Sequence, residues 1–336
     1  MTSNASTQGQ ADDQVLDVRN LTVSYKTESG YVKAVDDISF TVRKGEILGL
    51  AGESACGKST TALSIMRLLA PNARVDGQIL FDDKDVLQMS ESELRNFRWK
   101  GVSLIPQGSM NSLDPVIQVG KQIVEAIRAH ESASRADAWK TTEKLLSSVS
   151  IHPTRAKNYP HEFSGGMKQR AVTAMALALN PRLVIADEPT TALDVVVQKQ
   201  LLLVLRNLQK DSGISFIFVS HDLSVIGEIA DRVAVMYAGK IVEIGRKEIV
   251  LKNPSHPYTQ ALVNSVPKVF GNRQSLESIP GSPPTGVWPE GCRFHPRCKF
   301  AFNLCKQKEP ELQLAATGSL AACHLITKTG EEPLPG

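Results

Sequence analysis

The chain of 336 residues contains no long apolar run. No stretch approaches the ~18–20 consecutive apolar residues of a membrane-spanning helix, and the polar start MTSNASTQGQADDQ lacks the apolar core of a secretory signal. A strong charge of either sign is also missing, because 38 basic and 35 acidic residues leave a net charge of +3, which argues against nucleic acid as the main partner. We therefore expect a cytoplasmic globular protein whose residues 1–14 form a disordered tail.

Cysteine and proline are unevenly distributed. Cys56 lies alone in a glycine-rich segment, and the other four cysteines lie near the C-terminus. In a reducing cytoplasm such a cluster is more typical of a metal site than of disulfides. Eleven of the 18 prolines lie at Pro254 or beyond, which predicts a separate, loop-rich part over residues 253–336.

The remaining pattern predicts an α/β fold. Residues 15–42 alternate between apolar and polar around a turn at Ser29-Gly30, as antiparallel strands do. Residues 90–180 are mostly helical in pattern. The short apolar runs LVIADE and ISFIFVSHD resemble buried parallel strands with functional side chains at their carboxyl ends, and VAVMYAGKIVEIG is typical of a hairpin turning at Ala238-Gly239.

A glycine-rich segment between a predicted strand and a predicted helix fits the phosphate loop G-x-x-x-x-G-K-[ST]. Its residues are Gly52, Glu53, Ser54, Ala55, Cys56, Gly57, Lys58, Ser59 and Thr60. In such a loop backbone N–H groups and the helix N-terminus surround the phosphates. Lys58 would neutralise the β- and γ-phosphates of ATP, and the Ser59 hydroxyl would reach Mg²⁺. Ala55 is strained if its position requires a positive φ.

The run LVIADE supplies two carboxylates at the end of a strand. We expect Asp187 to hold Mg²⁺ directly or through water, and Glu188 to polarise the attacking water. Alone, the pair would be interpreted as two solvated carboxylates; a phosphate loop earlier in the chain favours the catalytic interpretation.

A second helix start has the features of a phosphate site. Ser164, Gly165, Gly166 and Met167 open the helix QRAVTAMALALN. Ser164 is a good N-cap, whereas two glycines inside the helix start cost stability. They fit a backbone that another molecule must approach closely.

With these two segments the chain resembles the ATP-binding cassette (ABC) ATPases, and SGGM stands for their SGGQ signature. The resemblance implies a P-loop core with an N-terminal antiparallel β subdomain and a helical signature subdomain, spanning residues 15–252. It also implies a head-to-tail pair of cassettes, in which one signature completes the ATP site of the other.

Further positions follow from the same resemblance. Gln107 matches the glutamine that contacts Mg²⁺ and senses the transmembrane partner, Asp194 the interface loop of the dimer, and His221 the histidine beside the γ-phosphate. Tyr25 is the candidate that stacks on adenine, ahead of Tyr31. Alone, Asp194 would be interpreted as a helix cap, His221 as a structural histidine and Tyr25 as a strand aromatic.

The C-terminal part resembles the extension of ATPase subunits from oligopeptide, dipeptide and nickel importers. Its cysteines are Cys292, Cys298, Cys305 and Cys323, spaced C-x5-C-x6-C-x17-C. Four thiolates suit a [4Fe–4S] cluster or Zn²⁺. Relatives favour the cluster, in a structural role; zinc and metal-free cysteines remain alternatives. The stretch from His256 to Tyr258 either docks the extension or is a stiff linker.

The resemblance implies an ATPase that energises an importer, with peptides as the expected cargo and oligosaccharides or nickel as alternatives. Its partners would be a second cassette subunit (a paralogue rather than a copy), two transmembrane permeases and an extracytoplasmic substrate-binding protein. The chain would then be peripheral, on the cytoplasmic face of the membrane. A soluble ABC ATPase without a transport role is the competing class. The short distance between Lys58 and Ser164, without sustained heptads, argues against it.

Overall fold

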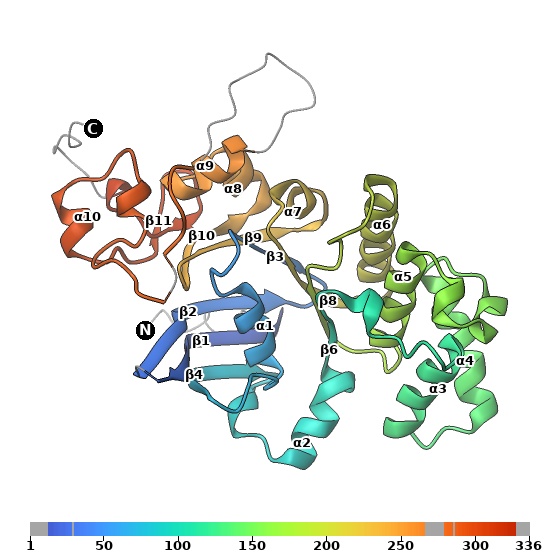
Figure 1. Cartoon of the computed structure of the whole chain (residues 1–336). Coiled ribbons are helices and arrows are strands. Elements are labelled where there is room, and N and C mark those ends of the chain that lie inside the picture. The colour runs from blue at the N-terminus through green and yellow to red at the C-terminus, as the bar shows by residue number, and fades with distance from the viewer. Residues whose placement is uncertain (1–12, 29, 266–278, 285, 327–336) are drawn as a thin grey trace, which may run out of the picture. The chain divides into compact units, whose positions relative to one another are not determined.

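The computed structural model describes residues 13–28, 30–265, 279–284 and 286–326 (Figure 1). These residues form two compact units that alternate along the chain. The first takes the described residues up to 16, together with 41–47 and 80–219; the second takes those of 17–40, 48–79 and 220–326. Residues 1–12 of the predicted tail lie outside the described residues.

Three parallel strands form the centre of the first unit: β6 (Val102–Ile105), β7 (Leu183–Asp187) and β8 (Ser215–Ser220). Every residue of β7 and β8 is buried, which explains their continuous apolar sequences. Ile105 is paired with Ala186, and Asp187 with Val219. Because the carboxyl ends of parallel strands meet at one edge, the residues after β6 and β7 are brought together there.

The first unit also holds four helices that begin within residues 90–180, where the sequence predicts a helical region, and a fifth helix beyond it. These are α2 (Glu91–Asn96), α3 (Val119–His130), α4 (Arg135–Ser148), α5 (Gly165–Ala176) and α6 (Val195–Ser212). Helices α3, α4 and α5 pack against one another, green in Figure 1. One face of α3 buries Val119, Ile123, Val124 and Ile127, at the three- and four-residue spacing of an amphipathic helix.

The second unit contains most of the N-terminal strands. They are β1 (Gln14–Thr27), β2 (Gly30–Arg43) and most of β4 (Ala73–Phe81), with β1 between the other two. The short β5 (Lys84–Asp85) pairs with the last residues of β4 and belongs with them to the first unit. In the second unit β3 (Ile47–Ala51) pairs in parallel with β9 (Arg232–Tyr237), which forms a hairpin with β10 (Lys240–Arg246). The predicted hairpin turn at Ala238-Gly239 is therefore confirmed.

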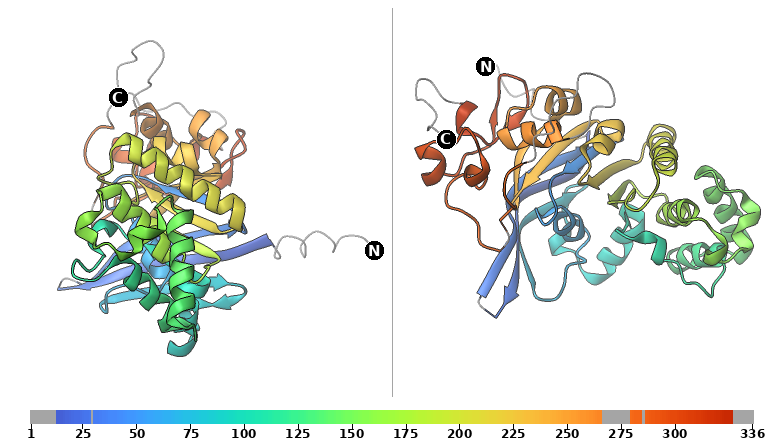
Figure 2. Two further views of the ribbon diagram at one scale, coloured as in Figure 1. Left: turned by 90° about the vertical axis from the view of Figure 1, so that its right-hand side faces the viewer. Right: turned by 45° about the horizontal axis from the view of Figure 1, so that its top comes forward.

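Short elements complete the second unit. Figure 2 shows those of the C-terminal part in orange and red. The short elements are α1 (Lys58–Ile65), α7 (Leu223–Ile229), α8 (Lys247–Lys252), α9 (Pro257–Ser265), α10 (Asn303–Gln307), β11 (Gln313–Leu314) and β12 (Leu320–Ala321). Strand β12 pairs with β10 and with β11. Within the described part of the chain, no helix combines the length and apolar character needed to span a membrane.

A buried carboxylate fastens the C-terminal part to β10. Glu243 has no exposed surface, and it accepts hydrogen bonds from the backbone N–H groups of Ser255 and His256 and from the Ser319 hydroxyl, at 2.8–3.0 Å. Of the two interpretations of the stretch from His256 to Tyr258, these contacts favour docking over a stiff linker.

Candidate functional site

The predicted phosphate loop, residues 52–60, connects β3 to α1. Its backbone passes through three positive φ angles: 147° at Gly52, 63° at Ala55 and 105° at Gly57. Gly57 is the N-cap of α1, and no side chain caps the backbone there. Uncapped N–H groups at a helix start bind anions, so the backbone has the form that phosphate binding needs.

Two glycines of this loop have no room for a side chain. A Cβ atom on Gly52 would lie 2.3 Å from the Met236 carbonyl oxygen, and one on Gly57 would lie 2.6 Å from that of Ala34. Ala55 does occupy the left-handed region, where an L-residue is strained. The sequence predicts strain at Ala55 if its φ is positive. The structure has that positive φ, so the strain is present.

Lys58 is fixed inside the loop. Its side chain is buried, and Nζ donates to the carbonyl oxygens of Gly52 and Glu53, both at 2.8 Å. The Cys56 sulfur lies 3.7 Å from the same Nζ. Burial raises the pKa of the Cys56 thiol, so this side chain is uncharged where it lines the loop.

A second group of predicted residues lies at the carboxyl edge of β6 and β7. Asp187 is the buried last residue of β7. Glu188 follows with φ at 47°, and its N–H donates to the Val219 carbonyl at 3.0 Å. Gln107, two residues after β6, donates from Nε2 to Glu188 Oε2 at 3.3 Å. Three of the predicted residues are therefore neighbours, and the strained backbone at Glu188 is typical of a functional position.

Thr191 also contacts the Glu188 carboxylate. Its hydroxyl donates to Oε2 at 3.0 Å, and its backbone N–H donates to the Glu188 carbonyl oxygen at 3.2 Å. One amide and one hydroxyl thus both donate to Oε2 of this carboxylate. Sequence reasoning missed Thr191, although its place three residues after Glu188 is a usable signal.

The signature segment begins α5 as predicted. Ser164 is the N-cap, and its hydroxyl accepts from the Met167 N–H at 3.3 Å. Ser164 and Gly165 are exposed, so this helix start is open to a second molecule. Gly166 has a different reason to be glycine: its Cβ would lie 2.2 Å from a methyl carbon of Val197 on α6. For Gly166 the close approach is therefore to this chain itself.

Asp194, His221 and Tyr25 lie at three different elements of the structure. Asp194 caps α6 by accepting from the N–H groups of Val196 and Val197, both at 3.0 Å. His221 follows β8 directly and is exposed. Tyr25 is half-buried on β1, whereas Tyr31 on β2 is 59% exposed. Tyr25 and His221 belong to the second unit with the phosphate loop, and the other predicted nucleotide-site residues belong to the first.

The four C-terminal cysteines line one small cavity of about 10 Å³, together with His256, His295 and His324. Burial raises the pKa of Cys292 to about 12 and that of Cys323 to about 11. As the side chains are placed, no three Cys, His, Asp or Glu residues in the described ranges form a group that could hold a metal ion. The shared cavity agrees with the predicted metal site, and the placement of the thiols does not.

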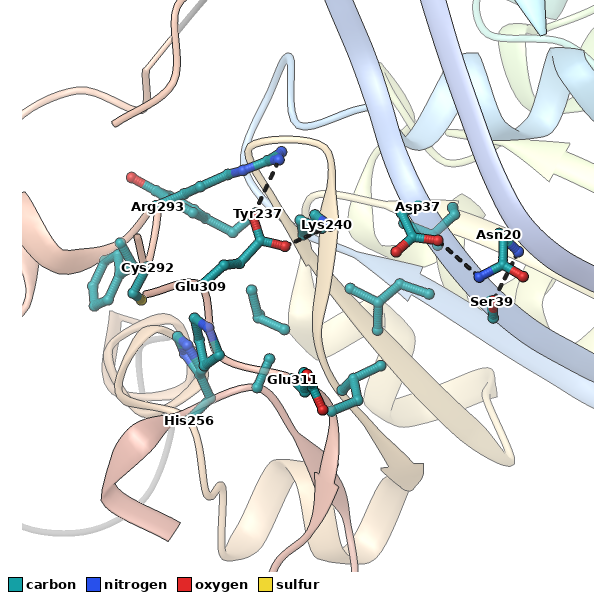
Figure 3. Close-up of a pocket in the computed structure, with 17 residues that line it drawn as sticks. Asn20, Asp37, Ser39, Tyr237, Lys240, His256, Cys292, Arg293, Glu309 and Glu311 are labelled. Carbon is teal, nitrogen blue, oxygen red and sulfur yellow. Dashed lines mark hydrogen bonds and ion pairs between the residues drawn. The ribbon is translucent and has the colours of Figure 1, made fainter. Parts of the chain in front are cut away.

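A larger cavity of about 430 Å³ lies between β1, β2, β10 and the C-terminal part (Figure 3). Its charged groups are largely paired with one another. Lys240 and Arg293 both contact Glu309, at 2.6 and 3.6 Å, and the Asn20 amide donates to Asp37 at 2.8 Å. The Arg293 guanidinium also lies 3.6 Å from the centre of the Trp288 ring. Of these contacts, the Lys240–Glu309 pair joins β10 to the C-terminal part.

Comparison with known proteins agrees with this geometry. Residues 35–191 match the family described as "ABC transporter", and residues 242–305 match "Oligopeptide/dipeptide transporter, C-terminal region". The oligopeptide transport ATP-binding protein OppD of Escherichia coli is 43% identical over 317 residues, covering 94% of both chains. The dipeptide transport ATP-binding protein DppD of Bacillus subtilis is 44% identical over 324 residues, covering 95% of this chain and 97% of DppD.

Solved structures agree on the fold. That of cbiO1 from Clostridium perfringens, part of the ABC transporter complex cbiONQ, has a TM-score of 0.61 at 26% identity and covers 72% of this chain and 92% of its own. The dimeric cassette MJ0796 with ADP and phosphate has a TM-score of 0.62 at 24% identity and covers 69% of this chain and 98% of its own.

The fold and the phosphate loop therefore define a P-loop ATPase of the cassette type. The chain belongs to the family of ABC transporter ATP-binding proteins, in the branch with the oligopeptide/dipeptide-type C-terminal region. It binds and hydrolyses ATP, and Mg²⁺ is the expected companion of that nucleotide.

Proposed function

We propose that this chain is the ATP-hydrolysing subunit of an ABC importer that carries oligopeptides or dipeptides across the cytoplasmic membrane. The observation that carries the proposal is the match of residues 242–305 to the C-terminal region of oligopeptide/dipeptide transporters. Near full-length similarity to OppD and DppD supports it. We infer a cassette domain over residues 15–252 and an extension over residues 253–336.

The phosphate loop carries the nucleotide chemistry in this proposal. The N–H groups of residues 52–60 surround the phosphates, Lys58 neutralises the β- and γ-phosphates, and Tyr25 stacks on the adenine. Ser59, Gln107 and Asp187 would hold Mg²⁺, because hydroxyl, amide and carboxylate oxygens are the donors that this ion prefers. When bound, the ion would supply positive charge that neutralises the phosphate oxygens.

Glu188 is the proposed general base. The Gln107 and Thr191 hydrogen bonds to its Oε2 support this role, because they fix the orientation of the carboxylate. His221 acts beside the γ-phosphate. Hydrolysis then depends mainly on positioning and on charge neutralisation, since phosphoryl transfer needs little covalent participation from the protein.

Each ATP site is completed by a second cassette subunit, which we propose is a paralogue. The exposed Ser164 and Gly165, with Met167 and the Asp194 loop, would face the nucleotide of that partner. Closure of the dimer on ATP would drive two permease subunits, and hydrolysis would reset it. An extracytoplasmic binding protein would deliver the cargo. The chain would lie peripherally at the cytoplasmic face of the membrane.

We propose further that Cys292, Cys298, Cys305 and Cys323 ligate a [4Fe–4S] cluster of structural role, with Zn²⁺ as the alternative. Four thiols around one cavity support this, and the side-chain placement noted above does not. A small part of a protein with little core gains stability from such a group. The hydrolytic mechanism uses none of its chemistry.

A substrate panel tests the function. The full chain, assembled with its partner cassette, permeases and binding protein in proteoliposomes, is assayed for ATP hydrolysis with dipeptides, longer peptides, oligosaccharides or Ni²⁺. Stimulation by peptides alone is expected. Stimulation by oligosaccharides or Ni²⁺ instead would replace the cargo and keep the importer. Full activity without any membrane partner would favour a soluble ABC ATPase.

A further inference from the structure

The C-terminal part contacts the phosphate loop through an ion pair between Arg297 and Glu53. Arg297 Nη1 lies 2.8 Å from Glu53 Oε2, and Nη2 lies 3.0 Å from Oε1, so the pair is bidentate. Only 6% of the Arg297 side chain and 24% of the Glu53 side chain are exposed. Charge-assisted pairs of this geometry are strong and directional. Glu53 directly follows Gly52, so the pair acts on the first turn of the loop.

Arg297 is itself fixed on its other sides. Its Nε donates to the Pro280 carbonyl at 2.7 Å, Nη2 donates to the Gly281 carbonyl at 3.2 Å, and Nη1 lies 3.3 Å from the Tyr237 hydroxyl. Burial opposes the charged form, yet the bonds to Glu53 and Tyr237 raise the pKa of Arg297 above its usual range. The guanidinium is therefore a charged, preorganised anchor.

Backbone contacts hold the loop at two further points. The Glu53 N–H donates to the Tyr258 hydroxyl at 2.9 Å, and the Gly239 N–H donates to the Cys56 carbonyl at 3.0 Å. Tyr258 is fully buried, 4.6 Å from Tyr237 between ring centres. Arg293 donates to the Ala238 carbonyl and pairs with Asp36, next to the turn that holds Cys56. Both arginines lie between Cys292 and Cys298.

We propose that Arg297 is a positioning residue for ATP binding, which acts through Glu53 to hold the phosphate loop in its binding form. The loop contains a strained Ala55, and this strain favours a relaxed loop conformation once Arg297 is removed. A relaxed loop must be ordered again on binding, and that cost lowers the affinity for ATP. Arg297 contacts none of the residues proposed for hydrolysis, so turnover at saturating ATP should change little.

The inference rests on ATP binding by this loop, so the parent chain is measured first. The full chain is titrated with a fluorescent ATP analogue and Mg²⁺, well below its unfolding temperature, and thermal unfolding is followed without nucleotide. We expect Arg297→Met to raise the Kd about 10-fold or more. Arg297→Lys, which keeps the charge but loses the fork, should be intermediate. In the assembled transporter the KM for ATP should rise while kcat stays within about twofold.

A reversed ion pair separates positioning from simple docking. The double variant Glu53→Arg with Arg297→Glu should bind ATP more tightly than either single variant, because only the double variant restores a pair. Arg74→Met, which removes an exposed pair with Asp76, is the matched control and should leave the Kd unchanged.

The outcomes distinguish the failures. A parent chain that binds no ATP refutes the function and the inference together. An Arg297→Met chain that binds ATP like the parent, whatever its unfolding temperature, overturns the inference alone, as does a double variant that shows no rescue. If Arg297→Met does not fold, the Kd values of Arg297→Lys and of the double variant test the inference in the same way.

Discussion

The side-chain amide of Gln107 donates to the carboxylate of Glu188, from Nε2 to Oε2 at 3.3 Å. The two residues are far apart in sequence and meet because β6 and β7 are parallel neighbours that end at the same edge. Gln107, which the resemblance predicts to sense the transmembrane partner, thus contacts the proposed base directly. In this structure a shift of the segment after β6 would also shift the hydrogen bonding of Glu188.

Replacing Glu188 by glutamine tests the base. The amide keeps the shape and the Thr191 contact but cannot take a proton, so kcat should fall about 100-fold or more with ATP binding retained. Phosphate release by the assembled transporter gives the rate, and nucleotide titration gives the affinity. Near-normal turnover in Glu188→Gln would remove Glu188 from its role.

Thr191→Val tests the hydroxyl that holds this carboxylate. Valine keeps the volume and loses one hydrogen bond, so kcat should fall roughly 10-fold while the KM for ATP stays close to the parent value. Thr141→Val, at an exposed position of α4, is the matched control. Equal rates for the two variants would show that Thr191 does not position Glu188.

Ala55→Gly tests the strain in the phosphate loop. Glycine adopts a φ of 63° without the steric cost that alanine has there. We expect the free energy of unfolding to rise by about 0.5–1 kcal/mol, after the greater entropy of glycine in the unfolded chain is subtracted. Urea unfolding without nucleotide measures it, and a loss of stability would contradict the assignment.

Glu243→Gln tests the attachment of the extension. The buried carboxylate accepts three hydrogen bonds, and an amide cannot accept all of them with its nitrogen. Leaving buried donors unsatisfied should cost about 2 kcal/mol of stability and expose residues after 253 to proteolysis. Glu311→Gln, at an exposed position, is the control. Equal proteolysis of the two variants would argue against this anchor.

Metal analysis decides the state of the four cysteines. Protein purified without oxygen should hold about four irons per chain and absorb broadly near 400 nm, roughly where such clusters absorb. Cys298→Ser should lose this absorption, and Cys56→Ser should keep it. About one zinc per chain would identify Zn²⁺ as the ion bound by the four cysteines. A chain with neither metal would show that the four cysteines are free thiols.

Local patterns were enough to predict much of the fold. The apolar runs of β7 and β8 and the turn at Ala238-Gly239 follow from burial and turn chemistry over a few residues. The phosphate loop is equally local, because its glycines and Lys58 are consecutive. Which predicted residues meet at the edge of β6 and β7 depends on strand pairing, which local patterns do not determine.

Contacts between distant residues could not be predicted from the sequence. Arg297 and Glu53 are 244 positions apart, and no periodic pattern links them. The φ of Ala55 is dictated by the loop around it, since alanine by itself avoids that region. The sequence predicts that Gly166 allows another molecule to approach, whereas the structure places Val197 of this chain against it. In each case the partner decides the role.

ATP hydrolysis by this chain is proposed to energise peptide uptake. This proposal is tested most directly by loading ATP and Mg²⁺ into proteoliposomes of the assembled transporter and measuring the accumulation of labelled peptide presented by the binding protein outside. We predict uptake that requires ATP and is lost with Glu188→Gln. Uptake that continues without ATP, or that is unchanged in Glu188→Gln, would contradict the account.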